Sequence, residues 1–189
     1  SRGRAALAAL PNIADRLTFT SDSKQVIATC KVDGQQEITF TRLSDWTRTA
    51  MRDVDSLVFD AAANRFARWG DDGRLELGEL ETGVVLKRIE VPRGYLVLGR
   101  SGKNVAVLGD GSRIRVFDAT NARALCEIKV DDRVVNTVEL SPDEKRLAIL
   151  ARGSVTIGKV ADGTLQAKCA GHAGAVHTAP FSPGGRWLG

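Results

Sequence analysis

A period of about 40 residues runs through the sequence and limits the folds that it can adopt. The two clearest copies, residues 139–148 and 180–189, share an apolar residue, a turn and a second apolar residue seven positions after the first. Weaker copies precede them. The first apolar residues of the five copies, which step by 40, 39, 42 and 41 residues, are Phe19, Phe59, Leu98, Leu140 and Phe181. A period of roughly 40 to 45 residues is typical of β-propeller blades.

Each copy is expected to hold four short strands. Asp-Gly or a similar pair recurs at 33–34, 72–73, 110–111 and 152–153, where a tight hairpin needs positive φ. Alternating β patterns follow at 37–40, 74–77, 113–117 and 154–157. Further turns at 82–83, 120–121 and 162–163 lead to a last strand, such as 84–91 or 123–130. We therefore predict an all-β fold of about four four-stranded antiparallel units and a partial fifth.

The period also divides the chain into segments. Residues 1–12 are predicted to be a linker or a short helix, because an Ala-rich run at 4–10 ends at Pro11, where a helix would stop. The repeated units are predicted at about 13–51, 52–91, 92–131 and 132–170, with a partial unit at 171–189.

The last segment carries a family resemblance. Residues 171–189 read GHAGAVHTAPFSPGGRWLG, which resembles the opening of a WD40 repeat. The pair that names the family corresponds to Phe117-Asp118, and Gly78-Glu79 and Gly158-Lys159 stand at matching places. The resemblance spans the chain from about residue 13 and implies a WD40-like β-propeller. Another propeller family with similar four-stranded blades is the alternative.

An array of such units buries its apolar surface only by stacking. One blade has two apolar faces and can bury neither without a neighbour. Propellers close with roughly four to eight blades, whereas this sequence stops where a second strand is expected. We therefore expect an incomplete propeller whose native chain continues, and whose open blade edges could support self-association.

Composition and charge narrow the function classes. The 27 Lys and Arg and 23 Asp and Glu residues are interspersed, with no basic run of five, so nucleic acid is not an expected partner. No run approaches the roughly 18 apolar residues of a membrane helix, so we expect no membrane partner and a cytoplasmic protein. Cys30, Cys126 and Cys169 show no metal or disulfide spacing and are predicted to be small buried apolar residues.

No catalytic pattern is evident. His172 and His177 have no Asp or Glu near them in the sequence, so a metal site is not expected. The resemblance implies instead that His172 joins a hydrogen-bond network within its blade. Ser141 and Ser182 lie in Ser-Pro turns and not in a G-x-S-x-G elbow. We expect no enzyme activity, no cofactor and no metal.

The resemblance also implies where a partner binds. WD40 propellers most often use the loops that join blades and the turns between second and third strands. These places hold the candidate interaction residues Arg52, Arg93, Tyr95, Arg133, Arg152 and His172. Arg and Tyr are frequent at interface hot spots, although each residue could instead be part of a solvated loop. Three tryptophans are expected to pack between blades: Trp46, Trp69 and Trp187.

These observations predict a non-catalytic protein–protein interaction scaffold that binds a protein or peptide on its loop face. The alternative is a substrate-binding or sensory propeller module of a larger enzyme, such as a multidomain kinase.

Overall fold

The chain folds into β-strands and the turns between them. A computed structural model describes residues 14–20, 23–32, 35–51, 56–131 and 135–189. Apart from a short 3-10 turn at Asp110–Ser112, the described residues contain no helix. The prediction of an all-β fold is confirmed, whereas the predicted linker or helix at 1–12 lies outside the described residues.

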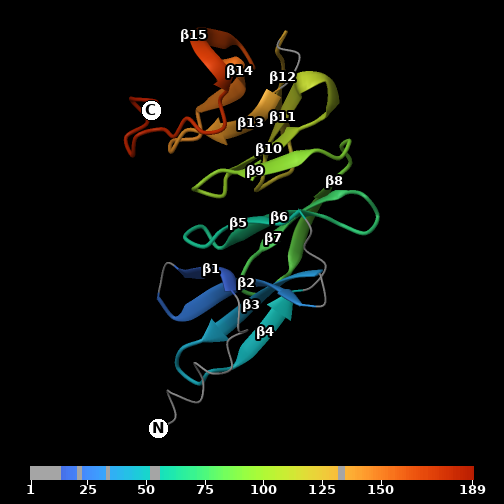
Figure 1. Ribbon diagram of the computed structural model, residues 1–189. Coiled ribbons are helices and arrows are strands. Elements are labelled where there is room, and N and C mark those ends of the chain that lie inside the picture. Colours follow the sequence, from blue (N-terminus) through green and yellow to red (C-terminus); the bar gives the residue numbers. More distant parts are fainter. Residues whose placement is uncertain (1–13, 21–22, 33–34, 52–55, 132–134) are drawn as a thin grey trace.

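The strands form four antiparallel sheets, each in sequence order (Figure 1). The first contains β1 (Ala14–Phe19), β2 (Gln25–Val32), β3 (Gln35–Arg42) and β4 (Arg48–Met51). The second contains β5 (Val58–Asp60), β6 (Arg65–Trp69), β7 (Leu75–Glu79) and β8 (Val85–Ile89). The third contains β9 (Tyr95–Leu98), β10 (Asn104–Leu108), β11 (Arg113–Asp118) and β12 (Ala124–Lys129). The fourth contains β13 (Val135–Leu140), β14 (Arg146–Lys159) and β15 (Leu165–Ala175).

The chain reverses direction within β14. The amide of Val160 donates to the carbonyl of Lys145 at 2.9 Å, which joins the residues on either side of the strand. If the 14-residue strand were straight, these two residues would lie about 50 Å apart, at ~3.3 Å per residue. Gly153, with φ of +77°, lies at the reversal. The other sheets have the same bond between their second and third strands: Leu43 to Lys24, Leu80 to Asn64 and Ala119 to Lys103. The fourth sheet therefore has the same four segments as the others.

The 40-residue period is a structural repeat. The apolar residues seven positions apart are cross-strand partners at the first hairpin of each unit: Phe19–Val26, Phe59–Phe66, Leu98–Val105, Leu140–Leu147 and Phe181–Leu188. In four of the five hairpins the backbone turns through a left-handed residue at the same position: Ser23, Gly102, Glu144 and Gly185. The repeat found in the sequence therefore marks one side chain pair and one turn in every unit.

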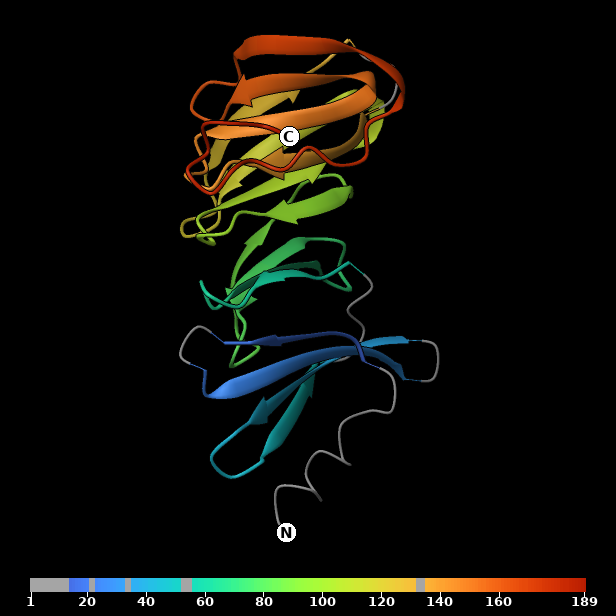
Figure 2. The ribbon, with the colours of Figure 1, turned by 60° about the vertical axis from the view of Figure 1, so that its left-hand side comes forward.

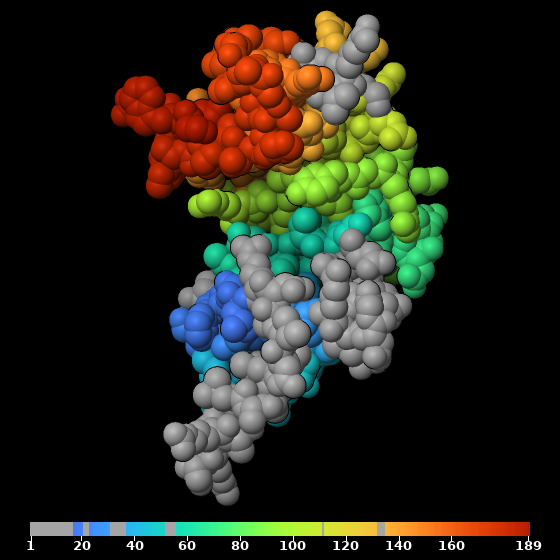
Figure 3. All heavy atoms as spheres, viewed as in Figure 1, coloured from blue at the N-terminus to red at the C-terminus, as the bar shows by residue number. Residues whose placement is uncertain are grey.

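The sheets stack face to face, with an apolar core between each neighbouring pair (Figure 2). Alternate residues of a strand point to opposite cores, as the pleat requires. In β14, Leu147 and Ile149 face the third sheet, whereas Ala148 and Leu150 face the C-terminal segment. Figure 3 shows the result, in which the colours follow one another from the blue first sheet to the red C-terminal segment.

The described sheets form an open stack and do not close into a ring. The C-terminal unit contributes one bridge, between Phe181 and Leu188, that packs on the fourth sheet. The strand β15 continues to Ala175, past the position where we expected the fourth unit to end. The finer prediction, an incomplete WD40-like propeller, therefore remains a proposal.

Some predictions of burial were wrong. Trp69 does pack between the second and third sheets, but Trp46 and Trp187 are 39% and 74% exposed. Cys30 is buried as predicted, whereas Cys169 is exposed because it lies on the outermost strand, β15. An outer strand and a turn bury less of each side chain than the two central strands of a stacked sheet, and the sequence pattern does not separate these cases.

Candidate interaction surface

The two ends of the stack carry different connections. In each sheet the turn between the second and third strands and the link to the next sheet lie at one end, because neighbouring strands are antiparallel. We call this the connecting end. It includes residues 70–74, 90–94 and 109–112 and the reversal at 152–153. The other hairpin turns lie at the opposite end, which we call the hairpin end.

Four of the six predicted interaction residues lie at the connecting end: Arg93, Tyr95, Arg152 and His172. Their positions follow from the repeat, which the sequence had revealed. They form two separate pairs. Arg93 and Tyr95 lie where the second sheet leads into the third, whereas Arg152 and His172 lie on the fourth sheet. Arg52 and Arg133 lie outside the described residues.

The first pair is held by the second sheet. The Arg93 guanidinium donates to the carbonyl of Gly70 at 3.1 Å and lies over the Trp69 ring, 5.9 Å from its centroid. The indole Nε1–H of Trp69 donates to the carbonyl of Gly94 at 3.0 Å. At Gly94 a Cβ would lie 2.2 Å from the carbonyl oxygen of Leu108, so this close approach requires glycine. These contacts fix Arg93 while leaving it exposed.

Tyr95 begins β9 next to this arrangement. It pairs with Leu108 in the sheet, and its side chain is 59% exposed, whereas its neighbour Leu96 is 3% exposed. Leu96 faces the core shared with the second sheet and Val97 the core shared with the fourth, so alternation puts the Tyr95 side chain on the side of the fourth sheet. Arg93 instead lies on Trp69 of the second sheet. Tyr and Arg are among the residue types that most often dominate interface energy.

Two nearby acidic side chains, Glu76 and Asp72, already have partners. Glu76 is 5% exposed and accepts from Arg68 at 2.9 Å and from Arg88 at 3.0 Å. Asp72 accepts from the amide of Arg74 at 3.0 Å. Over the part of the chain that the structure describes, Arg93 makes no ion pair. Its charge is therefore available to an acidic group or a carbonyl of a partner.

The second pair lies on the fourth sheet. Both Arg152 and His172 are exposed, and a Cβ on Gly153 would lie 3.1 Å from the His172 carbonyl oxygen, so the two segments touch. A hollow of about 580 Å³ beside them is lined by both histidines and by Cys169. Searched over the described ranges, the chain holds no cluster of three metal-ligating side chains.

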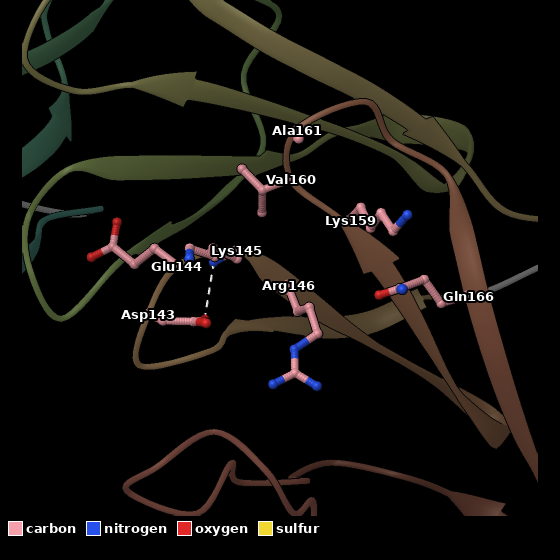
Figure 4. A pocket seen from close by; sticks show the side chains of 8 residues that line it. All are labelled: Asp143, Glu144, Lys145, Arg146, Lys159, Val160, Ala161 and Gln166. Atoms are coloured by element: carbon pink, nitrogen blue, oxygen red, sulfur yellow. Dashed lines mark hydrogen bonds between the residues drawn. The ribbon is translucent and has the colours of Figure 1, made fainter.

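A pocket that the sequence pattern does not predict lies at the hairpin end of the fourth sheet (Figure 4). Its volume is about 560 Å³, and its lining is Asp143, Glu144, Lys145, Arg146, Lys159, Val160, Ala161 and Gln166. These residues come from two segments, 143–146 and 159–166, that are 13 or more positions apart, and the reversal in β14 brings them together.

Most charged groups of this pocket hold the fold together. The Asp143 carboxylate accepts from the Ser141 hydroxyl at 2.6 Å, which is the main reason that its pKa is lowered. The Arg146 guanidinium donates to the carbonyl of Gly185 and lies over the Phe181 ring. In Figure 4 the Glu144 carboxylate points away from Lys159, toward the third sheet. The charged side chains of this pocket therefore mainly connect neighbouring repeats.

Comparison with known proteins identifies no family: neither a family model nor a curated protein matches the chain. We also find that none of the described segments is a helix with the length and hydropathy needed to cross a bilayer.

Proposed function

We propose that this chain is a non-catalytic protein-interaction module built of WD40-like repeats, and that it binds a protein or peptide at its connecting end. One observation carries the proposal. Arg93, in the link between β8 and β9, is preorganised over Trp69 of β6, two positions before the exposed Tyr95. Such a site loses little side chain entropy when a partner binds.

The side chains define the chemistry of the partner. Arg93 can bind a carboxylate or a main-chain carbonyl of the partner, and Tyr95 can pack against an apolar or aromatic group. We also propose that the protein is located in the cytoplasm. Cys126 and Cys169 are free thiols, and a reducing compartment favours this state.

The test compares the proteins that bind the wild-type chain and its variants. The tagged chain is used as bait, and bound proteins are quantified by mass spectrometry. For Arg93→Ala combined with Tyr95→Ala we expect a loss of at least ~30-fold for the specific partners, because two hot-spot side chains are removed. The matched control is Arg123→Ala, an exposed arginine at the hairpin end. Equal retention of the same partners by both variants would contradict the proposal.

A further inference from the structure

The pocket of the fourth sheet has a counterpart elsewhere in the repeat. It is lined by the first hairpin turn and by the turn between the third and fourth segments. The first sheet has a hollow of about 500 Å³ lined by the same two turns, at residues 23–25 and 42–44. The amide of Val160 donates to the carbonyl of Lys145 beside the pocket, and the amide of Leu43 donates to Lys24 beside the hollow, at 2.9 and 2.8 Å. The two spaces are therefore equivalent.

This space belongs to the repeat and does not depend on an end of the stack. The hollow of the first sheet is also lined by Glu81, from the turn between β7 and β8 of the complete second sheet. A complete following unit therefore leaves the space open. In the fourth sheet, all lining residues belong to segments 143–146 and 159–166, so that sheet alone forms the pocket.

Two lysines of this pocket have no partner that would explain them. Lys145 and Lys159 are exposed, and within the described ranges neither makes an ion pair. The nearby acids are engaged in other contacts. Asp143 and Asp162 each accept from a hydroxyl of their own turn at 2.6 Å. The Glu144 carboxylate binds the third sheet. The positive charge of the two lysines is therefore available to a ligand.

The repeat does not require cations at these two positions. In the second sheet they hold Asn64 and Glu79, which form a hydrogen bond at 3.3 Å. The third sheet has opposite charges there, Lys103 and Asp118. In the first sheet an ion pair at 3.3 Å neutralises Arg42. Two unpaired cations therefore distinguish the pocket of the fourth sheet from its equivalents.

The lining combines this charge with an apolar wall. Val160 and Ala161 line the pocket between the two lysines in the sequence, and Gln166 adds an amide that can donate a hydrogen bond. In Figure 4, Lys159 and Gln166 lie on one side of the view and Lys145 on the other. The volume of about 560 Å³ lies within the range of roughly 300–1,000 Å³ that is typical of small-molecule sites. A phosphate monoester carries about −1.5 to −2 charges at pH 7, which matches two lysines better than one carboxylate does.

We propose that the fourth-sheet pocket binds a small organic phosphate. The ammonium groups of Lys145 and Lys159 hold the phosphate, and the apolar body of the ligand packs against Val160 and Ala161. The pocket lies at the hairpin end, whereas the protein partner proposed above binds at the connecting end. Either proposal can therefore fail without the other.

Titration with phenyl phosphate, followed by NMR, tests the site. We expect saturable shifts of the amides in segments 143–146 and 159–166. The affinity should be at least ~10-fold higher than for inorganic phosphate or for benzyl alcohol, because each of these offers only part of the contacts. Lys145→Ala and Lys159→Ala should each weaken binding by ~10-fold, since each removes a charge-assisted hydrogen bond. The matched control is Lys103→Ala, at the same position of the third sheet, which should bind like the wild type.

All three lysines are exposed, so the variants should keep the circular dichroism spectrum and the melting temperature of the wild type. Lys159→Arg keeps the charge and should retain most of the affinity. The absence of saturable shifts up to ~10 mM phenyl phosphate would overturn the proposal. An equal loss of affinity in Lys103→Ala would also overturn it, because it would indicate attraction to the net charge alone. A phosphotyrosyl peptide that binds more than ~10-fold more tightly than phenyl phosphate would replace the small molecule with a segment of a protein partner.

Discussion

Glu144 shows how one side chain joins two repeats. It lies in the first hairpin of the fourth sheet, is 3% exposed and has φ of +54°. Its carboxylate accepts from the amides of Ser101 and Asn104 at 2.6 and 2.8 Å, and from the Ser101 hydroxyl. At Gly99 a Cβ would lie 2.2 Å from the Glu144 carboxyl carbon, so the third sheet leaves room for this side chain.

Glu144→Ala would leave these donors on Ser101 and Asn104 without their buried acceptor. We expect the free energy of unfolding to fall by ~2–4 kcal/mol, measured by urea unfolding at pH 7. Glu90→Ala, at an exposed position, is the control and should change it by less than ~0.5 kcal/mol. Equal effects of the two variants would mean that the contact between the repeats adds nothing.

Gly78 lies at a position where the structure leaves no room for a side chain. The resemblance matches it to the Trp of a WD40 repeat, but a Cβ there would lie 2.3 Å from the Phe66 ring and 2.4 Å from the carbonyl oxygen of Val84. Phe66, at 1% exposure, fills the space. Gly78→Ala should therefore lower the melting temperature by several degrees, through a loss of ~2 kcal/mol or more. Gly109→Ala, where a Cβ meets nothing closer than 3.8 Å, should leave it nearly unchanged.

The turns between the third and fourth strands of the first, third and fourth sheets are capped in the same way. Thr47 donates to Asp45, Thr120 to Asp118 and Thr164 to Asp162, in each case through both the amide and the hydroxyl. The hydrogen bonds from the threonines are the main cause that lowers the pKa of each carboxyl. A carboxylate caps the turn only while it is ionised.

Because of this capping, we expect the free energy of unfolding to depend on pH in the acidic range. Because the pKa in the folded chain lies below the unfolded value of about 3.9, the stabilisation is present above about pH 4 and is lost as pH falls through the folded values. We expect the urea midpoint to fall steadily below pH 4. With Asp118→Asn and Asp162→Asn together the fall should be shallower, because these turns no longer lose a charge. An identical pH profile for the double variant would show that other groups cause the acid sensitivity.

The elements could be read from the sequence because their signals are local. Apolar residues seven apart and Asp-Gly turns report contacts within one hairpin, and the structure places them there. The contact of Arg93 with Trp69 joins residues 24 positions apart and has no periodic signal. The sequence therefore indicated that Arg93 lies at the connecting end, but not that an indole holds it.

At the scale of the whole molecule, the stack has interfaces of unequal size. The described cores hold ten buried residues between the second and third sheets and nine between the third and fourth, but five between the first and second. In a stacked repeat each unit is stabilised by its neighbours, so the first sheet should separate first.

Limited proteolysis under native conditions tests this order. We expect early cleavage within residues 23–51 and a longer-lived product that holds the second to fourth sheets. First cuts within residues 104–160 would mean that the apolar cores do not rank the sheets by stability.

One antiparallel sheet recurs four times along the stack, and the fourth copy includes the reversal within β14. Residue-resolved hydrogen exchange by NMR tests this fourfold repeat. The amides of Leu43, Leu80, Ala119 and Val160, which make the equivalent bond in the four sheets, should all be protected at least ~100-fold over the unfolded chain. Exchange of Val160 at the unfolded rate, with the other three protected, would contradict the reversal in β14 and the fourfold repeat.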